Sequence, residues 1–205
     1  MKKSRFLKII LFISFLGIFT GCQNPTNNID QNKKQSEVNK TQDMDTNEKT
    51  LVVYFSQTGT TKRLAEYAAD ILNADIYEII AAEPYTKEDL AYYTNGRADQ
   101  EQSDPSVRPQ ISGEIKNMEE YDRIILGYPI WHSQAPKIII TFLEKYDFSK
   151  KTIIPFCTSH SSGIGSSASH LHEYTAPTTT WLEGKRFGGE TSKKEIEEFL
   201  NGIID

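Results

Sequence analysis

Cysteine is nearly absent from the chain, because Cys22 and Cys157 are the two that its 205 residues contain. A framework of disulfide bonds therefore does not hold this fold together. An excess of basic residues is lacking too, since the formal net charge at pH 7 is −5. Because the phosphates of nucleic acids demand a basic face, the sequence predicts no nucleic-acid partner.

The apolar run near the N-terminus is too short to cross a membrane. It extends from Ile9 to Phe19, whereas a spanning helix needs about 20 apolar residues. Basic residues precede it within positions 2–8, and its length is that of the h-region of a secretory signal peptide. Residues 1–21 are therefore predicted to be a signal peptide and not part of the fold.

The signal ends in Phe19-Thr20-Gly21-Cys22, which resembles the bacterial lipobox. In that motif the cysteine thiol is acylated and becomes the new N-terminus after cleavage. The departure is Phe19, which stands where an aliphatic residue is usual. The alternatives are a plain secretory signal with an incidental cysteine and an uncleaved N-terminal anchor. All three place the domain outside the cytoplasm, and the resemblance implies a bacterial cell-membrane lipoprotein with its lipid on Cys22.

Residues 22–49 are predicted to carry that lipid anchor and then to form a disordered tether. Asn, Gln, Asp, Lys and Thr dominate the segment, and large apolar side chains are few. Such a stretch cannot bury enough apolar surface to offset the entropy lost on ordering. A flexible chain of this length would let the domain range about 30 Å from the membrane.

From residue 50 onward the hydrophobic pattern predicts strands that alternate with helices. Leu51 to Phe55 is a short continuous apolar run, typical of a strand buried on both faces, and apolar residues at helical spacing follow it. This alternation predicts an α/β domain over 50–205, with a parallel sheet and helices on both of its faces. Further strands are expected at 76–80, 123–128 and 152–157, and further helices after Pro136 and over the last 14 residues.

Two segments have a less definite pattern. Residues 178–187 have the composition of a fifth strand, but Gly184 interrupts them and a hairpin fits equally well. Residues 81–118 predict at most one short helix, near 87–93. Three charged residues of this segment either order it or meet a substrate, and these are Arg97, Glu101 and Arg108.

Three loops leave the carboxyl ends of predicted strands, which meet at one rim of a parallel sheet, where such folds bind ligands. The first loop has hydroxyls directly before a helix, whose free N–H groups and partial positive charge favour a phosphate. It lacks the Gly-Lys-Ser/Thr ending of nucleoside-triphosphate loops and the three-glycine dinucleotide fingerprint. The alternative is a helix cap without a ligand. Its residues are Ser56, Thr58, Gly59, Thr60 and Thr61.

The other two loops have the composition of a site for a flat heteroaromatic ring. In the second loop Trp131 either stacks on such a ring or covers the hydrophobic core. The third loop has small residues whose backbone donors would let a ring's polar edge approach. Serine-histidine catalysis is disfavoured there, because the Gly-x-Ser-x-Gly elbow is absent and no acid partner is indicated. The residues are Pro129, Ile130, Trp131 and His132 in the second loop, and Thr158, Ser159, His160, Ser161 and Gly163 in the third.

Together these motifs resemble the flavodoxin-like family over residues 50–205. The segment 53–62 resembles that family's FMN phosphate loop, and 127–131 and 155–159 resemble its two other flavin loops. The resemblance implies a three-layer α/β sandwich with a five-stranded parallel sheet in the order 2-1-3-4-5. It also implies FMN at the rim, with its phosphate on the first loop, its isoalloxazine along the second and its pyrimidine side against the third.

Three features depart from the family pattern. Relatives often have a second Trp where His132 stands and paired glycines where His160 and Ser161 stand. They also commonly have a stacking Tyr in the third loop, which is lacking here. His160 is a candidate to become protonated when the flavin is reduced and so to stabilise the reduced ring.

The function expected from this resemblance is that of an extracytoplasmic, FMN-binding electron-transfer protein. Its partners would be redox proteins at the membrane or a small electron acceptor. One alternative is an FMN-dependent reductase of a quinone or similar acceptor, and another is a binding module that has lost flavin. Cys157 is read as a small buried hydrophobe. His170 and His172 are weak evidence for a metal, and no metal site is predicted.

Overall fold

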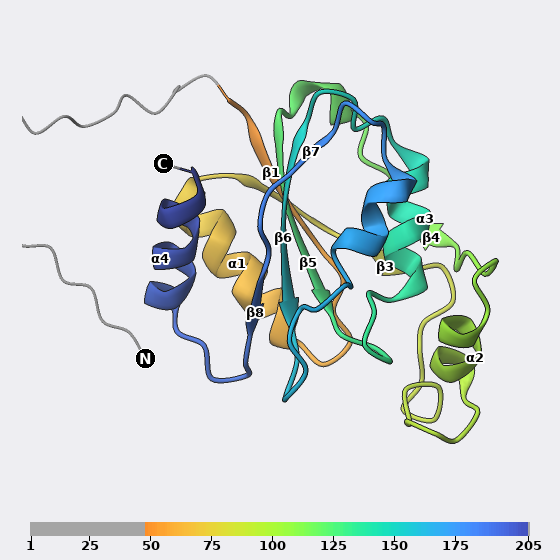
Figure 1. Cartoon of the computed structure of the whole chain (residues 1–205). Helices are drawn as coiled ribbons and strands as arrows, with labels where there is room; N and C mark the ends of the chain where they lie inside the picture. The colour runs from red at the N-terminus through yellow and green to blue at the C-terminus, as the bar shows by residue number, and fades with distance from the viewer. Residues whose placement is uncertain (1–47, 205) are drawn as a thin grey trace, which may run out of the picture. The chain divides into compact units, whose positions relative to one another are not determined.

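The computed structural model describes residues 48–204 and has a parallel sheet at its centre (Figure 1). The strands lie in the order β2-β1-β5-β6-β7, and β8 also pairs with β6. Every pairing in this sheet is parallel, so the predicted α/β fold and strand order are confirmed. The strands are β1 (Thr50–Tyr54), β2 (Asp75–Glu78), β5 (Arg123–Pro129), β6 (Thr152–Thr158), β7 (Thr180–Trp181) and β8 (Lys185–Phe187).

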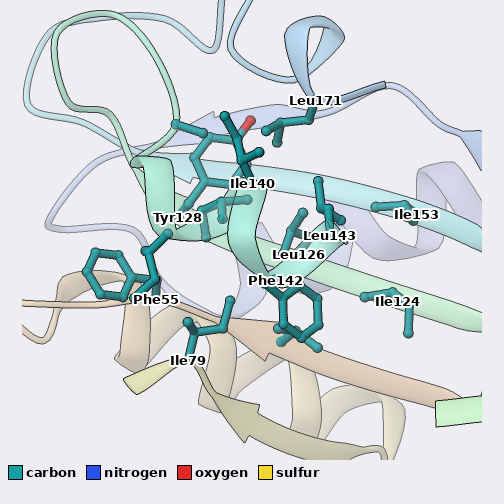
Figure 2. Packing of buried hydrophobic residues seen from close by; sticks show 14 of the residues in the cluster. Phe55, Ile79, Ile124, Leu126, Tyr128, Ile140, Phe142, Leu143, Ile153 and Leu171 are labelled. Atoms are coloured by element: carbon teal, nitrogen blue, oxygen red, sulfur yellow. The ribbon is translucent and has the colours of Figure 1, made fainter. Parts of the chain in front are cut away.

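Helices cover both faces of the sheet (Figure 1). The central strands are buried on both sides, so alternate residues feed two separate cores. Val52 and Tyr54 belong to one core with the helices α1 and α4, whereas Val53 and Phe55 belong to the other with α3, part of which Figure 2 shows. The helices are α1 (Thr60–Leu72), α2 (Arg97–Ser103), α3 (Lys137–Lys145) and α4 (Lys193–Ile204), with short 3-10 turns at Met118–Glu120 and Ser169–Tyr174.

The fifth strand is broken into two pieces, β7 and β8, and both run parallel to β6. A hairpin is therefore the wrong alternative for residues 178–187. The break lies beside Pro155, which has no N–H to donate to the ladder. Ile153, two residues earlier and facing the same neighbour, accepts a hydrogen bond from the N–H of Leu182. A Cβ at Gly184 would lie 2.7 Å from Cγ of Pro155, so a glycine is needed at the break.

The segment between β2 and β5 differs from the expected one. No helix forms at 87–93. The carboxylate of Asp89 instead accepts hydrogen bonds from the N–H and hydroxyl of Thr86, at 2.8 and 2.9 Å, and holds a turn. The helix of this segment is α2, which begins after Gly96. The strand expected at 76–80 also ends early, since β3 (Ile80–Ala81) separates from β2 and pairs antiparallel with β4 (Ile111–Ser112).

The predicted signal peptide, the tether up to residue 47 and the lipid on Cys22 lie outside the described residues. Across positions 48–204, none of the helices has both the length and the apolar character that crossing a membrane requires.

Candidate functional site

The three predicted loops converge on one cavity of about 580 Å³ at the carboxyl ends of β1, β5 and β6. This volume lies within the roughly 300–1,000 Å³ typical of small-molecule sites. Of the residues predicted to bind a ligand, all but Ser56, Gly59 and Gly163 line it. The lining residues are Gln57, Thr58, Thr60, Thr61, Leu90, Tyr92, Tyr93, Pro129, Ile130, Trp131, His132, Ser133, Thr158, Ser159, His160, Ser161, Ser162 and Gly189.

The first loop turns tightly into α1. Gly59 has a φ of 84°, in the left-handed region that glycine tolerates best, and its N–H donates to the hydroxyl of Ser56 at 3.2 Å. No side chain caps the N-terminus of α1, so its first amides are left for a ligand. Two residues of the loop, Thr58 and Thr60, line the cavity, and no Asp or Glu is among its lining residues.

Thr61 has a different role from its neighbours. Its side chain is buried, and its hydroxyl lies 2.7 Å from that of Thr158, in the third loop. The hydroxyls of Ser56 and Thr61 are thus engaged in shaping the loop, and those of Thr58 and Thr60 remain for a ligand.

The second loop contains a two-residue turn, and the side chain of Gln102 stabilises it through hydrogen bonds. Trp131 and Gln134 exchange backbone hydrogen bonds of 2.9 Å, and the two residues between them have φ values of 47° and 64°. The side-chain amide of Gln102, in α2, donates to the carbonyls of Trp131 and Ala135 and accepts from the N–H of Lys137. The segment 81–118 therefore holds the second loop in place.

Trp131 covers the core. Only 8% of it is exposed, and its ring meets Phe55 and Tyr85 edge to face, with centroids 5.5 and 5.3 Å apart. Of the two roles predicted for Trp131, these contacts show that it covers the hydrophobic core. Trp131 also forms part of the cavity wall, so stacking on a ligand stays a prediction.

An arginine that the sequence did not single out fixes the third loop. The guanidinium of Arg186, in β8, donates to the carbonyls of Ser159 and His160 at 2.8 and 2.6 Å. The N–H of Ser159 also bonds to the carbonyl of Phe187 at 3.1 Å. With these carbonyls turned toward β8, His160 and Ser161 line the cavity. Gly163 lies further along the loop and does not.

Tyr92 and Tyr93, which were not predicted to belong to the site, also form part of the cavity wall. The hydroxyl of Tyr92 donates to the carbonyl of Ile130 at 3.2 Å, so this turn touches the second loop. A local feature of the sequence could have indicated these residues. The two adjacent tyrosines come directly before Thr94-Asn95-Gly96, a composition typical of turns.

Charged residues of the same segment order it. The Arg97 Nε donates to the buried carboxylate of Glu101 at 2.7 Å, and the Tyr85 hydroxyl donates to that carboxylate at 2.5 Å. The pKa of Tyr85 is well above its usual range, mainly because the hydroxyl is buried and secondly because it donates a hydrogen bond to Glu101. Arg108 forms a two-pronged pair with Glu144 of α3. Ordering is thus the role that the contacts show for these residues.

A family model described as Flavodoxin matches residues 49–203. This chain belongs to the flavodoxin family. The match covers nearly all of the described domain and agrees with the order of its parallel strands.

Crystal structures of three flavoproteins resemble the flavodoxin domain. Two of them, from Bacteroides, were assigned as flavoproteins only provisionally. The protein from Bacteroides eggerthii is 41% identical, with a TM-score of 0.72, over 78% of this chain and 99% of that one. The protein from Bacteroides uniformis is 39% identical, with a TM-score of 0.71, over 75% and 98%.

The third is a flavoprotein from Lactobacillus acidophilus in complex with FMN. It is 26% identical to this chain, with a TM-score of 0.55, over 68% of this chain and 93% of that one. A comparison with curated proteins finds no match.

The other residues that the sequence analysis considered for chemistry, Cys157, His170 and His172, do not line the cavity of this flavodoxin domain. Cys157 is fully buried in β6, and burial raises the pKa of its thiol to about 12, against a smaller opposing effect of Arg186. His170 pairs with Gln134 at 2.7 Å, whereas His172 stacks on Trp181. Within the described part of the chain, no group of three or more His, Cys, Asp or Glu residues is placed to hold a metal ion.

Proposed function

We propose that this flavodoxin domain binds one FMN in the cavity, without a covalent bond, and passes electrons through it. The observation that carries the proposal is the meeting of three walls at one edge of the sheet. These are the uncapped N-terminus of α1, the second loop and the third loop. Ligands of open parallel sheets bind at this edge, and a helix N-terminus favours a phosphate.

The cavity suits the phosphate of FMN. None of its lining residues is Asp or Glu, so no carboxylate repels a phosphate there. Thr58 and Thr60 add hydroxyl donors without charge, beside the first amides of α1. The Lactobacillus protein that contains FMN has a related fold, which supports the same choice of cofactor.

The flavin ring would lie between residues 129–132 and 158–161. When bound, FMN accepts one or two electrons, and its surroundings determine which transfer is favourable. The residues of this chain bind and orient the ring. Arg186 holds two carbonyls of the third loop, which leaves the amides of His160 and Ser161 as candidate donors to the pyrimidine edge.

We favour an electron carrier over a reductase, because a carrier needs only a bound flavin with an accessible edge. Its partners would be redox proteins at the membrane or a small acceptor. A reductase of a quinone or similar acceptor would instead turn over NAD(P)H with the quinone, and the purified protein can be assayed for this directly.

The test is the absorption spectrum and calorimetry of residues 23–205 with added FMN and, separately, riboflavin. We expect saturable binding of FMN and a yellow protein. Replacing Thr58 and Thr60 together with valine should weaken FMN binding but leave riboflavin, which has no phosphate, unaffected. A folded protein that takes up neither flavin would refute the proposal and favour a module that has lost flavin.

We further propose that the chain is exported and attached to the bacterial cell membrane by a lipid on Cys22. The support is the lipobox-like ending of the N-terminal signal. Cells fed labelled palmitate should incorporate the label into the wild-type protein and not into a Cys22→Ser variant, which should leave the membrane fraction. Equal labelling of both proteins would exclude this anchor.

A further inference from the structure

Two adjacent tyrosines of the cavity wall expose most of their surface. Tyr93 is 89% exposed and Tyr92 is 51% exposed, and both residues line the cavity. Large aromatic side chains are usually buried, because their transfer from water is favourable. Exposed aromatic surface at the wall of a cavity is therefore surface that a ligand can cover.

The backbone that presents Tyr93 is in an unusual conformation. Tyr93 and Asn95 both have a φ of 60°, in the left-handed region that a bulky side chain such as tyrosine rarely adopts. Such conformations persist only where the surroundings impose them. The carboxylate of Asp99 imposes this one, since its Oδ2 accepts the N–H groups of Thr94 and Asn95 at 2.9 and 3.0 Å.

The same carboxylate also holds the second loop. The other oxygen of Asp99, Oδ1, lies 2.7 Å from Nε2 of His132, and only 13% of the Asp99 side chain is exposed. The His132 ring in turn contacts both tyrosines, with centroid distances of 5.1 Å to Tyr92 and 5.8 Å to Tyr93. Asp99 therefore fixes the position of the turn that carries Tyr92 and Tyr93 relative to the second loop.

We propose that Tyr93, positioned by Asp99, packs against the isoalloxazine ring and supplies the stacking aromatic that the third loop lacks. This inference rests on the proposed binding of FMN and names the contact for its ring. Trp131 lines the same cavity but is only 8% exposed, whereas Tyr93, at 89%, offers a ring far more uncovered surface. Tyr93 instead comes from the segment between β2 and β5, far from the third loop in sequence.

The test compares Tyr93→Ala, Tyr93→Phe and a control, Ile76→Ala, in the full chain. Ile76 is an exposed side chain of β2 that does not line the cavity. Stacking of two aromatic rings changes a dissociation constant by roughly 2–10-fold. We expect Tyr93→Ala to raise the dissociation constants of FMN and riboflavin alike by about this factor, and Tyr93→Phe and Ile76→Ala to leave both unchanged.

A second readout separates stacking from a change of fold. An adjacent tyrosine quenches the fluorescence of a flavin, so bound FMN should fluoresce more strongly in Tyr93→Ala than in the wild type. Unchanged affinity and fluorescence in Tyr93→Ala, with FMN still bound by the wild type, would overturn this inference alone. Absence of FMN binding by the wild type would overturn the proposed function as well.

The positioning role of Asp99 has its own test. In the wild-type background, Asp99→Ala should weaken the binding of FMN and raise the fluorescence of the bound flavin. The same change should have a much smaller effect in a Tyr93→Ala background, because the ring that Asp99 positions is then gone. Equal effects in the two backgrounds would show that Asp99 does not act through Tyr93.

Discussion

The hydroxyl oxygens of Thr61 and Thr158 lie 2.7 Å apart, and both side chains are buried. Thr61 is in the first turn of α1, and Thr158 ends β6. This hydrogen bond therefore joins the loop expected to bind a phosphate to the loop expected to face the ring. It fixes the separation of two cavity walls that are 97 residues apart in the sequence.

Replacing Thr61 with valine should destabilise the domain, because the buried hydroxyl of Thr158 would lose its hydrogen-bond partner. Such an unsatisfied group costs about 1–3 kcal/mol, whereas removing both hydroxyls is nearly neutral. Urea unfolding should therefore show a large loss for Thr61→Val and a partial recovery in the double variant with Thr158→Val. Thr60→Val, which alters the neighbouring residue, is the control. An equal loss in Thr60→Val and Thr61→Val would contradict this role of the hydrogen bond.

The sheet and its three loops could be predicted because their signals are local. Leu51 to Phe55 is apolar without interruption, and apolar positions at helical spacing follow it, which predicts a buried strand and then a helix. Parallel strands bring their carboxyl ends to one edge. The convergence of Thr58, Trp131 and His160 on one cavity followed from this rule, and the structure confirms it.

The features that could not be predicted depend on contacts between distant residues. The fifth strand breaks because Pro155 of the neighbouring strand lacks an N–H. The position of Tyr93 depends on Asp99, which also binds His132 across 33 residues of sequence. The site role of Arg186 depends on the pairing of β8 with β6. A single sequence contains each of these residues but not the pairing that gives it a role.

Removing the carboxylate of Glu101 should destabilise the segment that supports the second loop. Glu101 is buried and accepts hydrogen bonds from Arg97 and Tyr85. Hydrogen bonds to charged groups contribute about 1.5–3 kcal/mol, so Glu101→Ala should lower the free energy of unfolding by at least that amount. Glu83→Ala is the matched control, because the Glu83 carboxylate, 3.8 Å from the same arginine, is 86% exposed. Its loss should be below about 1 kcal/mol.

Chemical unfolding of the two variants decides between the alternatives. If Glu83→Ala and Glu101→Ala lose the same stability, burial of the Glu101 carboxylate has no special importance. A further consequence concerns Trp131, whose ring packs on Tyr85. Its fluorescence should shift toward that of solvent-exposed tryptophan in Glu101→Ala at low denaturant, and should not shift in Glu83→Ala.

A side chain at Gly127 should destabilise the domain. A Cβ at this position of β5 would lie 2.3 Å from Cζ of Phe156, whose ring is buried in the adjacent strand. Overpacking of this kind typically costs 1–3 kcal/mol, so Gly127→Ala should lower the melting temperature by several degrees. Gly188→Ala is the control, since apart from its two chain neighbours no residue has an atom within 4 Å of a Cβ there. A melting temperature unchanged by Gly127→Ala would show that Phe156 can move aside.

The thiol of Cys157 should resist alkylation in the folded protein. Burial raises its pKa to about 12, so roughly one thiol in 10⁴ is ionised at pH 8. In a Cys22→Ser background, where Cys157 is the remaining thiol, iodoacetamide should react slowly at low urea and quickly once the domain unfolds. Fast labelling of the native protein would mean that the thiol is accessible.

The same shift should make the stability of the domain fall at alkaline pH. An unfolded thiol ionises near pH 8.5, whereas the folded one retains its proton until about pH 12. Between these values the unfolded state binds fewer protons, so the free energy of unfolding decreases as pH rises, by at most about 1.4 kcal/mol per unit. A Cys157→Ala variant loses some stability at pH 7, because it removes a buried atom, but lacks this dependence. Urea unfolding from pH 7 to 11 should therefore show the two free energies drawing together, and parallel curves would mean that Cys157 does not titrate with unfolding.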